Sequence, residues 1–144
     1  APREKGGAGC AACHESAAFV IVTPRDNGLP ELAGRPDDGV GETTGLGADK
    51  GLFRTASLKN IAVTGPYMHD GRFATLEEVI EHYSSGIAAN PNLAPELKDK
   101  DGKPVRFDFT PEDKAALIAF LRTLTDEGLL ADPRFADPFR NPPG

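Results

Sequence analysis

The chain has 144 residues and a formal net charge of −6, which comes from 22 acidic and 16 basic side chains. This acidic balance argues against binding to nucleic acid and to anionic membrane surfaces, and it is compatible with a cationic redox partner. The length predicts one domain over residues 1–144, and no apolar run approaches the roughly 18 residues that would predict membrane insertion.

The first predicted element is a short helix over residues 9–18, which carries the run Cys10-Ala11-Ala12-Cys13-His14. A Cys-x-x-Cys-His run is the attachment signature of a c-type haem. Cys10 and Cys13 would form thioethers with the two haem vinyl groups, and His14 would bind the iron as its proximal ligand. The run therefore predicts one covalently bound haem c.

Two other chemistries also use a Cys-x-x-Cys pair. A zinc site would need two further ligands at close spacing, but the chain has no other cysteine. A thioredoxin-like redox motif would need a preceding hydrophobic strand, whereas residues 1–9 are polar and glycine-rich. Covalent haem is the favoured interpretation. Because thioethers are attached to haem outside the cytoplasm, it implies a periplasmic location.

Glycine and proline crowd into residues 24–51 and 91–104, which we expect to form long irregular loops. The one candidate for a strand is the apolar segment 19–22. Residues 1–9 and 131–144 are expected to be extended or loosely ordered. Irregular loops of this length need a group to pack against, and a haem would provide one.

Apolar periodicity predicts a second helix that begins after Thr75, with Glu78 completing a capping box, and that ends near Gly86. His82 is expected to face solvent. The apolar face of this helix is predicted to consist of Leu76, Val79, Ile80 and Tyr83.

A third helix is predicted from a Thr110 cap, with Pro111 at the first helical position, to an end at Gly128. Its buried stripe would comprise Leu117, Phe120, Leu121 and Leu124. The predicted class is therefore all-α, a cytochrome c-like haem domain with long Gly/Pro-rich loops. Such domains normally start with an amphipathic helix before the haem motif, and residues 1–9 offer no such face. We therefore expect a preceding segment that was removed or belongs to another domain.

A haem iron held by one imidazole has a sixth coordination position, and its ligand separates electron transfer from oxygen chemistry. The candidates are Met68, His69, His82 and Tyr83. Met68 is the only methionine of the chain and lies in a Pro/Gly loop, so a thioether ligand is one reading and a gap-filling core side chain is the other.

Residues 53–79 read FRTASLKNIAVTGPYMHDGRFATLEEV. This stretch closely resembles the C-terminal haem domain of the bacterial dihaem cytochrome c peroxidase family, which includes the MauG-like enzymes. The resemblance implies that the distal ligand lies fourteen residues after the loop histidine, where this chain has Tyr83. The MauG-like branch has an axial tyrosine there. We therefore favour Tyr83 and keep Met68 as the alternative; a half-buried aromatic with a satisfied hydroxyl is the third reading.

The resemblance carries further implications and also some departures. It implies a calcium ion bound partly by the main-chain carbonyls of Thr64 and Pro66, although much of that shell belongs to a domain absent here. It also implies that His69 pins its loop by hydrogen bonding. Family peroxidases carry two haem motifs and a bridging tryptophan, whereas this chain has one motif and no tryptophan. Arg54, Lys59 and Arg72 are candidates for pairing with haem propionates.

The sequence and the resemblance lead to three hypotheses about function. The first is a monohaem c-type cytochrome domain for electron transfer, which exchanges electrons with a redox partner protein or a second haem domain. The alternative is a fragment of a dihaem peroxidase or MauG-like oxidase that acts on peroxide together with the absent haem domain. The third is a sensor whose weak distal bond yields to a small ligand. We do not expect peroxidase turnover by this chain alone.

Overall fold

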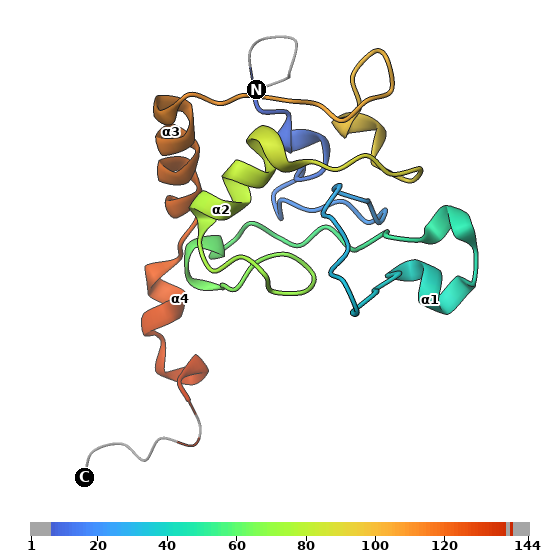
Figure 1. Ribbon diagram of the computed structural model, residues 1–144. Helices are drawn as coiled ribbons and strands as arrows, with labels where there is room; N and C mark the ends of the chain where they lie inside the picture. Colours follow the sequence, from blue (N-terminus) through green and yellow to red (C-terminus); the bar gives the residue numbers. More distant parts are fainter. Residues whose placement is uncertain (1–6, 138, 140–144) are drawn as a thin grey trace.

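The computed structural model describes residues 7–137 and 139. Its helices are α1 (Val40–Thr44), α2 (Leu76–Glu81), α3 (Pro111–Arg122) and α4 (Glu127–Ala131) (Figure 1). Short 3₁₀ turns lie at Cys10–Ala12, Gly47–Asp49, Ile61–Val63, Pro95–Leu97 and Pro133–Phe135. In the described part of the chain the only β pairing consists of isolated bridges, so the all-α prediction is confirmed there.

The capping residues predicted for α2 and α3 are confirmed. The Glu78 amide donates to Thr75 Oγ1 at 3.3 Å, and the Thr75 amide donates to Glu78 Oε2 at 2.9 Å. Thr110 and Asp113 make the same reciprocal pair at the start of α3. These boxes satisfy amide groups that have no partner inside the helix, which explains why both helices begin where the sequence predicts.

The core lies where α2 packs on α3 and on the loop before α2. Its buried members are Tyr67, Leu76, Ile80 and Ile118. The Tyr67 hydroxyl donates to the Ile61 carbonyl at 2.8 Å, which fixes this ring in the core. A second buried group, Ile87, Leu93, Ala94 and Val105, lies in the loops that follow α2.

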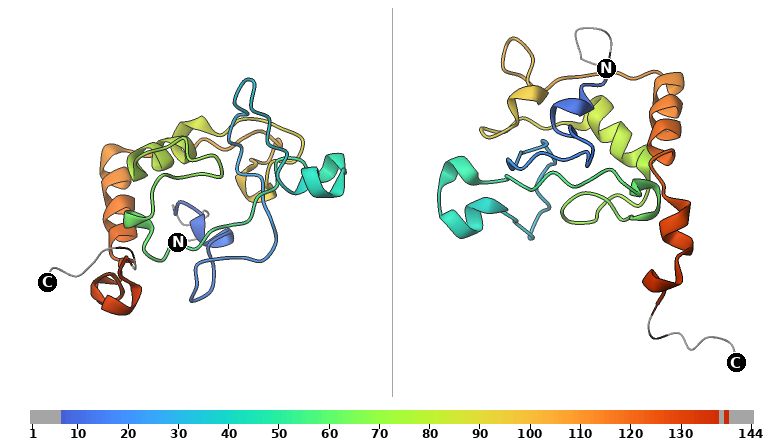
Figure 2. Two further views of the ribbon diagram at one scale, coloured as in Figure 1. Left: turned by 90° about the horizontal axis from the view of Figure 1, so that it is seen from below. Right: turned by 180° about the vertical axis from the view of Figure 1, so that it is seen from behind.

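The predicted helix over residues 9–18 is wrong, because only the 3₁₀ turn Cys10–Ala12 forms. Left-handed backbone conformations at Ser16 (φ 68°) and Phe19 (φ 54°) bend the chain out of a helical path. No strand forms at 19–22, and Val22 is 96% exposed. Seen from below in Figure 2, α2 and the loop before it partly surround the blue turn that carries Cys10.

The third helix ends at Arg122 and not at Gly128, which lies inside α4. Asn60 causes the break: its amide donates to the Leu124 carbonyl at 2.9 Å, and its side-chain oxygen accepts from the Asp126 amide at 2.7 Å. These contacts take backbone groups that a continuous helix would use. In Figure 1, α4 consequently runs on below α3 as a separate element.

Two other predictions need correction, and a third concerns termini that lie partly outside the described residues. Phe120 is 51% exposed, and Ile118 is the buried residue of α3. Residues 24–51 are not all irregular, because α1 and a 3₁₀ turn lie within them. Of the termini expected to be extended at 1–9 and 131–144, residues 1–6, 138 and 140–144 lie outside the described residues, and Pro133–Phe135 form a 3₁₀ turn instead of an extended segment. Within the described residues, no helix is long and apolar enough to span a bilayer.

Candidate haem site

The two cysteines of the haem motif are both free thiols. Cys10 begins the 3₁₀ turn and is exposed, and Cys13 follows that turn and is partly buried. The His14 amide donates to the Cys10 carbonyl at 2.8 Å, which closes the turn that holds the three residues together. Burial raises the pKa of the Cys13 thiol. Two adjacent, unpaired thiols followed by an imidazole fit covalent attachment of haem.

The imidazole of His14 is oriented by its own chain. Its Nδ1 lies 3.1 Å from the Phe19 carbonyl oxygen, which leaves Nε2 as the nitrogen able to bind iron. Ligating histidines generally make such a bond through the second ring nitrogen, and it fixes both tautomer and ring direction. Burial lowers the pKa of His14, against the effect of the Phe19 and Ala56 carbonyls, and so favours the neutral form that metals bind.

Tyr83 lies in a π-helical turn, His82–Gly86, that continues α2. Desolvation raises the pKa of its phenol to about 12, and electrostatic interaction with Cys10 and Cys13 adds to this, while a hydrogen bond from the Asn27 side chain opposes it. The phenol is therefore close enough to both thiols to interact with them electrostatically. π-helical turns are frequent at functional sites, and this one carries the favoured distal ligand.

His82 is not exposed, contrary to prediction; only 4% of its surface is accessible. Its Nε2 lies 3.1 Å from the Asn27 carbonyl oxygen, and its ring packs edge-on to Tyr83 with centroids 5.1 Å apart. The helical wheel failed because it does not show that the loop carrying Asn27 packs against this position and covers the ring. Its hydrogen bond gives His82 a structural role.

Met68 and His69 lie in the loop before α2, and each side chain contacts a neighbouring side chain. The Asn27 Nδ2 group donates to Met68 Sδ at 3.4 Å. The His69 ring stacks on Phe53 with centroids 3.7 Å apart and planes 7° apart. His69 thus restrains its loop, here through ring stacking.

Asn27 is the residue that sequence reasoning missed. It touches both candidate distal ligands, Met68 and Tyr83, and it also accepts from His82. The only signal in the sequence was an Asn-Gly pair within residues 24–51, and such a pair indicates a turn without indicating what the side chain contacts.

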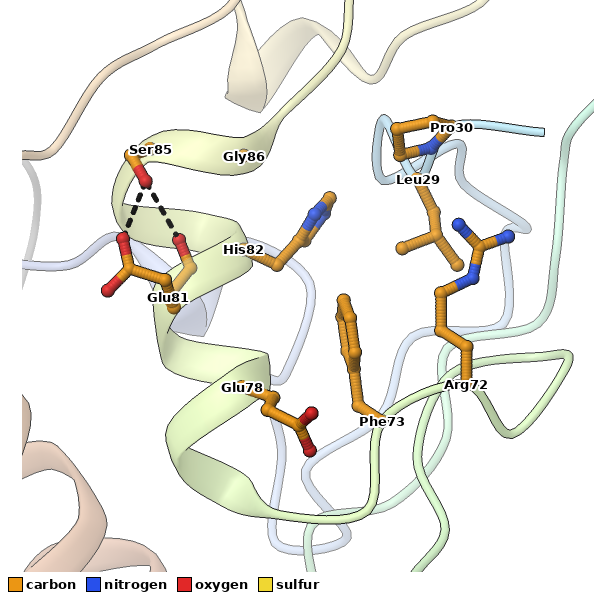
Figure 3. A pocket seen from close by; sticks show the side chains of 9 residues that line it. All are labelled: Leu29, Pro30, Arg72, Phe73, Glu78, Glu81, His82, Ser85 and Gly86. Carbon is orange, nitrogen blue, oxygen red and sulfur yellow. Dashed lines mark hydrogen bonds between the residues drawn. The ribbon is translucent and has the colours of Figure 1, made fainter. Parts of the chain in front are cut away.

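The basic residues proposed for haem propionates differ in their surroundings. Arg72 is paired with Asp70, whose Oδ2 accepts from Arg72 Nε at 2.8 Å. Arg72 also lines an open pocket of about 360 Å³, in which Phe73 and His82 lie opposite Leu29 and Pro30 (Figure 3). Neither cysteine of the haem motif lines that pocket. Pairing of Arg54, Lys59 or Arg72 with propionates stays a prediction.

The calcium prediction also remains a prediction. Thr64 and Pro66 are exposed and follow one another closely in the loop after the 3₁₀ turn Ile61–Val63. The Thr64 hydroxyl donates to the Ile61 carbonyl at 3.4 Å. In residues 7–137 and 139, no three His, Cys, Asp or Glu side chains come together as a metal site. Main-chain carbonyls would therefore have to supply the ligands from this chain.

Comparison with known proteins gives close sequence relatives, although no family model matches. A methylamine utilization protein MauG of Methylorubrum extorquens is 38% identical over 124 residues, which cover 85% of this chain and 32% of that protein. Cytochrome c551 peroxidase of Nitrosomonas europaea is 31% identical over 123 residues, which cover 84% of this chain and 32% of that protein.

A solved structure of a related protein is also similar to this chain in its fold. It is a MauG-like protein associated with microbial copper homeostasis, and it matches with a TM-score of 0.73 and 44% identity. The match covers 94% of this chain and 48% of that one. This chain therefore spans about a third of the curated relatives' length and about half of the solved chain.

Proposed function

We propose that this chain is a haem c domain for one-electron transfer. The proposal rests on the predicted kinship with the bacterial dihaem cytochrome c peroxidases and MauG-like proteins, which is confirmed over most of this chain. Cys10 and Cys13 anchor the haem, His14 is the proximal ligand and Tyr83 is the distal ligand. The location would be periplasmic, and the partner a redox protein or a second haem domain.

The observation that carries this proposal is the placement of His14 and Tyr83. His14 is held through Nδ1 by the Phe19 carbonyl, with Nε2 left to bind. Tyr83 comes from the π-helical turn that follows α2, and its phenol is close enough to the two thiols to interact with them electrostatically. An imidazole and a phenol from separate elements, both near the cysteines that would anchor haem, would supply the two axial ligands of a six-coordinate iron.

Haem iron exchanges one electron between its ferrous and ferric states. The residues of this chain set how easily it does so. A phenolate is a hard, anionic donor and favours ferric iron, so a Tyr83 ligand would lower the potential, whereas the Met68 thioether would raise it. The Phe19 carbonyl, in turn, would strengthen the donor character of His14.

A second candidate function is that the chain is part of a dihaem oxidoreductase. The observation that favours it is coverage, because the chain corresponds to only 32% of the MauG protein and 48% of the solved MauG-like chain. In that setting this haem would relay or store oxidising equivalents for the second haem domain. A calcium ion bound through Thr64 and Pro66 would then lie toward that domain.

Reversible spectroelectrochemical titration tests the electron-transfer proposal. We expect one haem with a single one-electron transition, a six-coordinate spectrum in both states and no binding of carbon monoxide at neutral pH. A five-coordinate ferrous state that takes up carbon monoxide would overturn the proposal in favour of small-ligand sensing. Rapid turnover of hydrogen peroxide by this chain alone would contradict the assignment of catalysis to a second haem.

A further inference from the structure

The side chain of Asn27 is held in one orientation. Its Oδ1 accepts from the Leu29 amide at 3.1 Å, so the NH₂ group must point away from Leu29. The neighbouring Asp26 is buried, and its side chain accepts from the Gly28 amide at 2.7 Å and from Asn90 Nδ2 at 3.0 Å. Asn27 therefore projects from a segment that is fixed on both sides.

The NH₂ group so oriented serves both candidate distal ligands. Nδ2 donates to Met68 Sδ at 3.4 Å. The Tyr83 phenol also shares a hydrogen bond with the Asn27 side chain. Because Oδ1 is turned toward the Leu29 amide, the NH₂ group is the donor left for this bond. An amide nitrogen has two protons, so one nitrogen can make both bonds. Met68 and Tyr83 thus lie within reach of a single donor.

The backbone of Asn27 adds a third contact to the same element. Its carbonyl accepts from His82 Nε2 at 3.1 Å, and His82 directly precedes Tyr83. Asn27 consequently fixes the start of the π-helical turn as well as the phenol that this turn carries. Met68 lies in a loop where its own backbone is left-handed at φ 71°, and its carbonyl accepts from the Gly71 amide at 3.4 Å.

We propose that Asn27 is a positioning residue that selects Tyr83 over Met68 as the distal ligand; this rests on the proposed role of Tyr83 as ligand. A thioether sulfur binds iron through a lone pair, and an N–H donated to that sulfur competes for it. The same amide group orients the phenol oxygen, and a hydrogen bond to a phenolate oxygen remains available after the oxygen binds a metal.

The test compares ferric and ferrous optical spectra and midpoint potentials of the holoprotein and two variants. Asn27→Asp keeps the Oδ1 acceptor for Leu29 and removes the donor, and Asn27→Leu removes both without adding charge. We expect wild type to lack the far-red sulfur-to-iron charge-transfer band. Both variants should gain that band and show a higher potential. A further Met68→Leu substitution should then remove the band.

The matched control is Asn92→Asp, because the Asn92 amide donates to the Gly47 and Lys50 carbonyls at 2.7 and 2.9 Å, away from Tyr83. Its spectrum should equal that of wild type. If both Asn27 variants keep the wild-type phenolate spectrum and potential, the selecting role of Asn27 is overturned while Tyr83 ligation stands. If wild type already shows the sulfur band, Tyr83 ligation fails and the selection fails with it.

Discussion

The Nε2 atom of His82 lies 3.1 Å from the carbonyl oxygen of Asn27, and this contact joins two residues 55 positions apart in the sequence. It ties the loop after the haem motif to the turn that presents Tyr83. The imidazole is buried and Asn27 is partly buried, so this contact is shielded from much of the solvent. The distal side is therefore held by a contact between a loop and a helix.

Replacing His82 with Phe should lower the free energy of unfolding by about 0.5–1.5 kcal/mol, because an aromatic ring remains while the partly buried Asn27 carbonyl loses its donor. Urea unfolding of the holoprotein, followed by far-ultraviolet circular dichroism, measures this. His69→Phe is the matched control, since the exposed His69 ring stacks on Phe53 and should keep that stacking. Equal midpoints for the two variants would show that the contact with Asn27 is dispensable.

In α3, the buried residue should matter more for stability than the predicted stripe. Ile118→Ala should cost roughly 2–5 kcal/mol, because Ile118 packs in the core with Tyr67, Leu76 and Ile80. Phe120→Ala should change the free energy of unfolding by less than about 1 kcal/mol, because Phe120 is 51% exposed. Thermal and urea unfolding of both variants check this. A larger loss for Phe120→Ala would contradict the packing of α3.

The capping box of α2 should make stability depend on pH. Hydrogen bonds from the Thr75 and Ala74 amides lower the pKa of Glu78 from its ordinary value of 4.5. The folded state thus favours the carboxylate, and the resulting stability is complete above 4.5 and is lost as the pH falls through the lower folded-state pKa.

Glu78→Gln should therefore be less stable than wild type at pH 6, with a difference that shrinks as both proteins are acidified below pH 4.5. Urea midpoints across this pH range give the measurement. Glu31→Gln, at an exposed loop position, is the control and should follow wild type throughout. A Glu78→Gln difference that is constant with pH would exclude linkage through this carboxylate.

The parts of this fold that sequence predicts are those with local causes. The Thr75 and Thr110 caps depend on contacts three residues apart, and both are found. The end of α3 depends on Asn60, which lies more than 60 residues away from the helix end that it binds. The burial of His82 depends on Asn27 in the same way. The periodicity of apolar residues does not reveal contacts between residues so far apart in the sequence.

In the candidate site too, residues identified by local sequence differ from residues whose role depends on distant contacts. The cysteines and His14 are identified by adjacency in sequence, because covalent attachment needs that spacing. Tyr83 is found from sequence only through the family resemblance. Asn27 could not be found at all, because its role depends on where the loop after the haem motif meets Met68 and the π-helical turn.

The optical spectrum of the ferric holoprotein at neutral pH tests whether Tyr83 is the distal ligand. We expect a phenolate-to-iron band that is lost in Tyr83→Phe. Tyr67→Phe is the control and should retain the band, because Tyr67, the only other tyrosine, donates to the Ile61 carbonyl in the core. A far-red sulfur-to-iron band in wild type that disappears in Met68→Leu would contradict Tyr83 ligation and make Met68 the ligand.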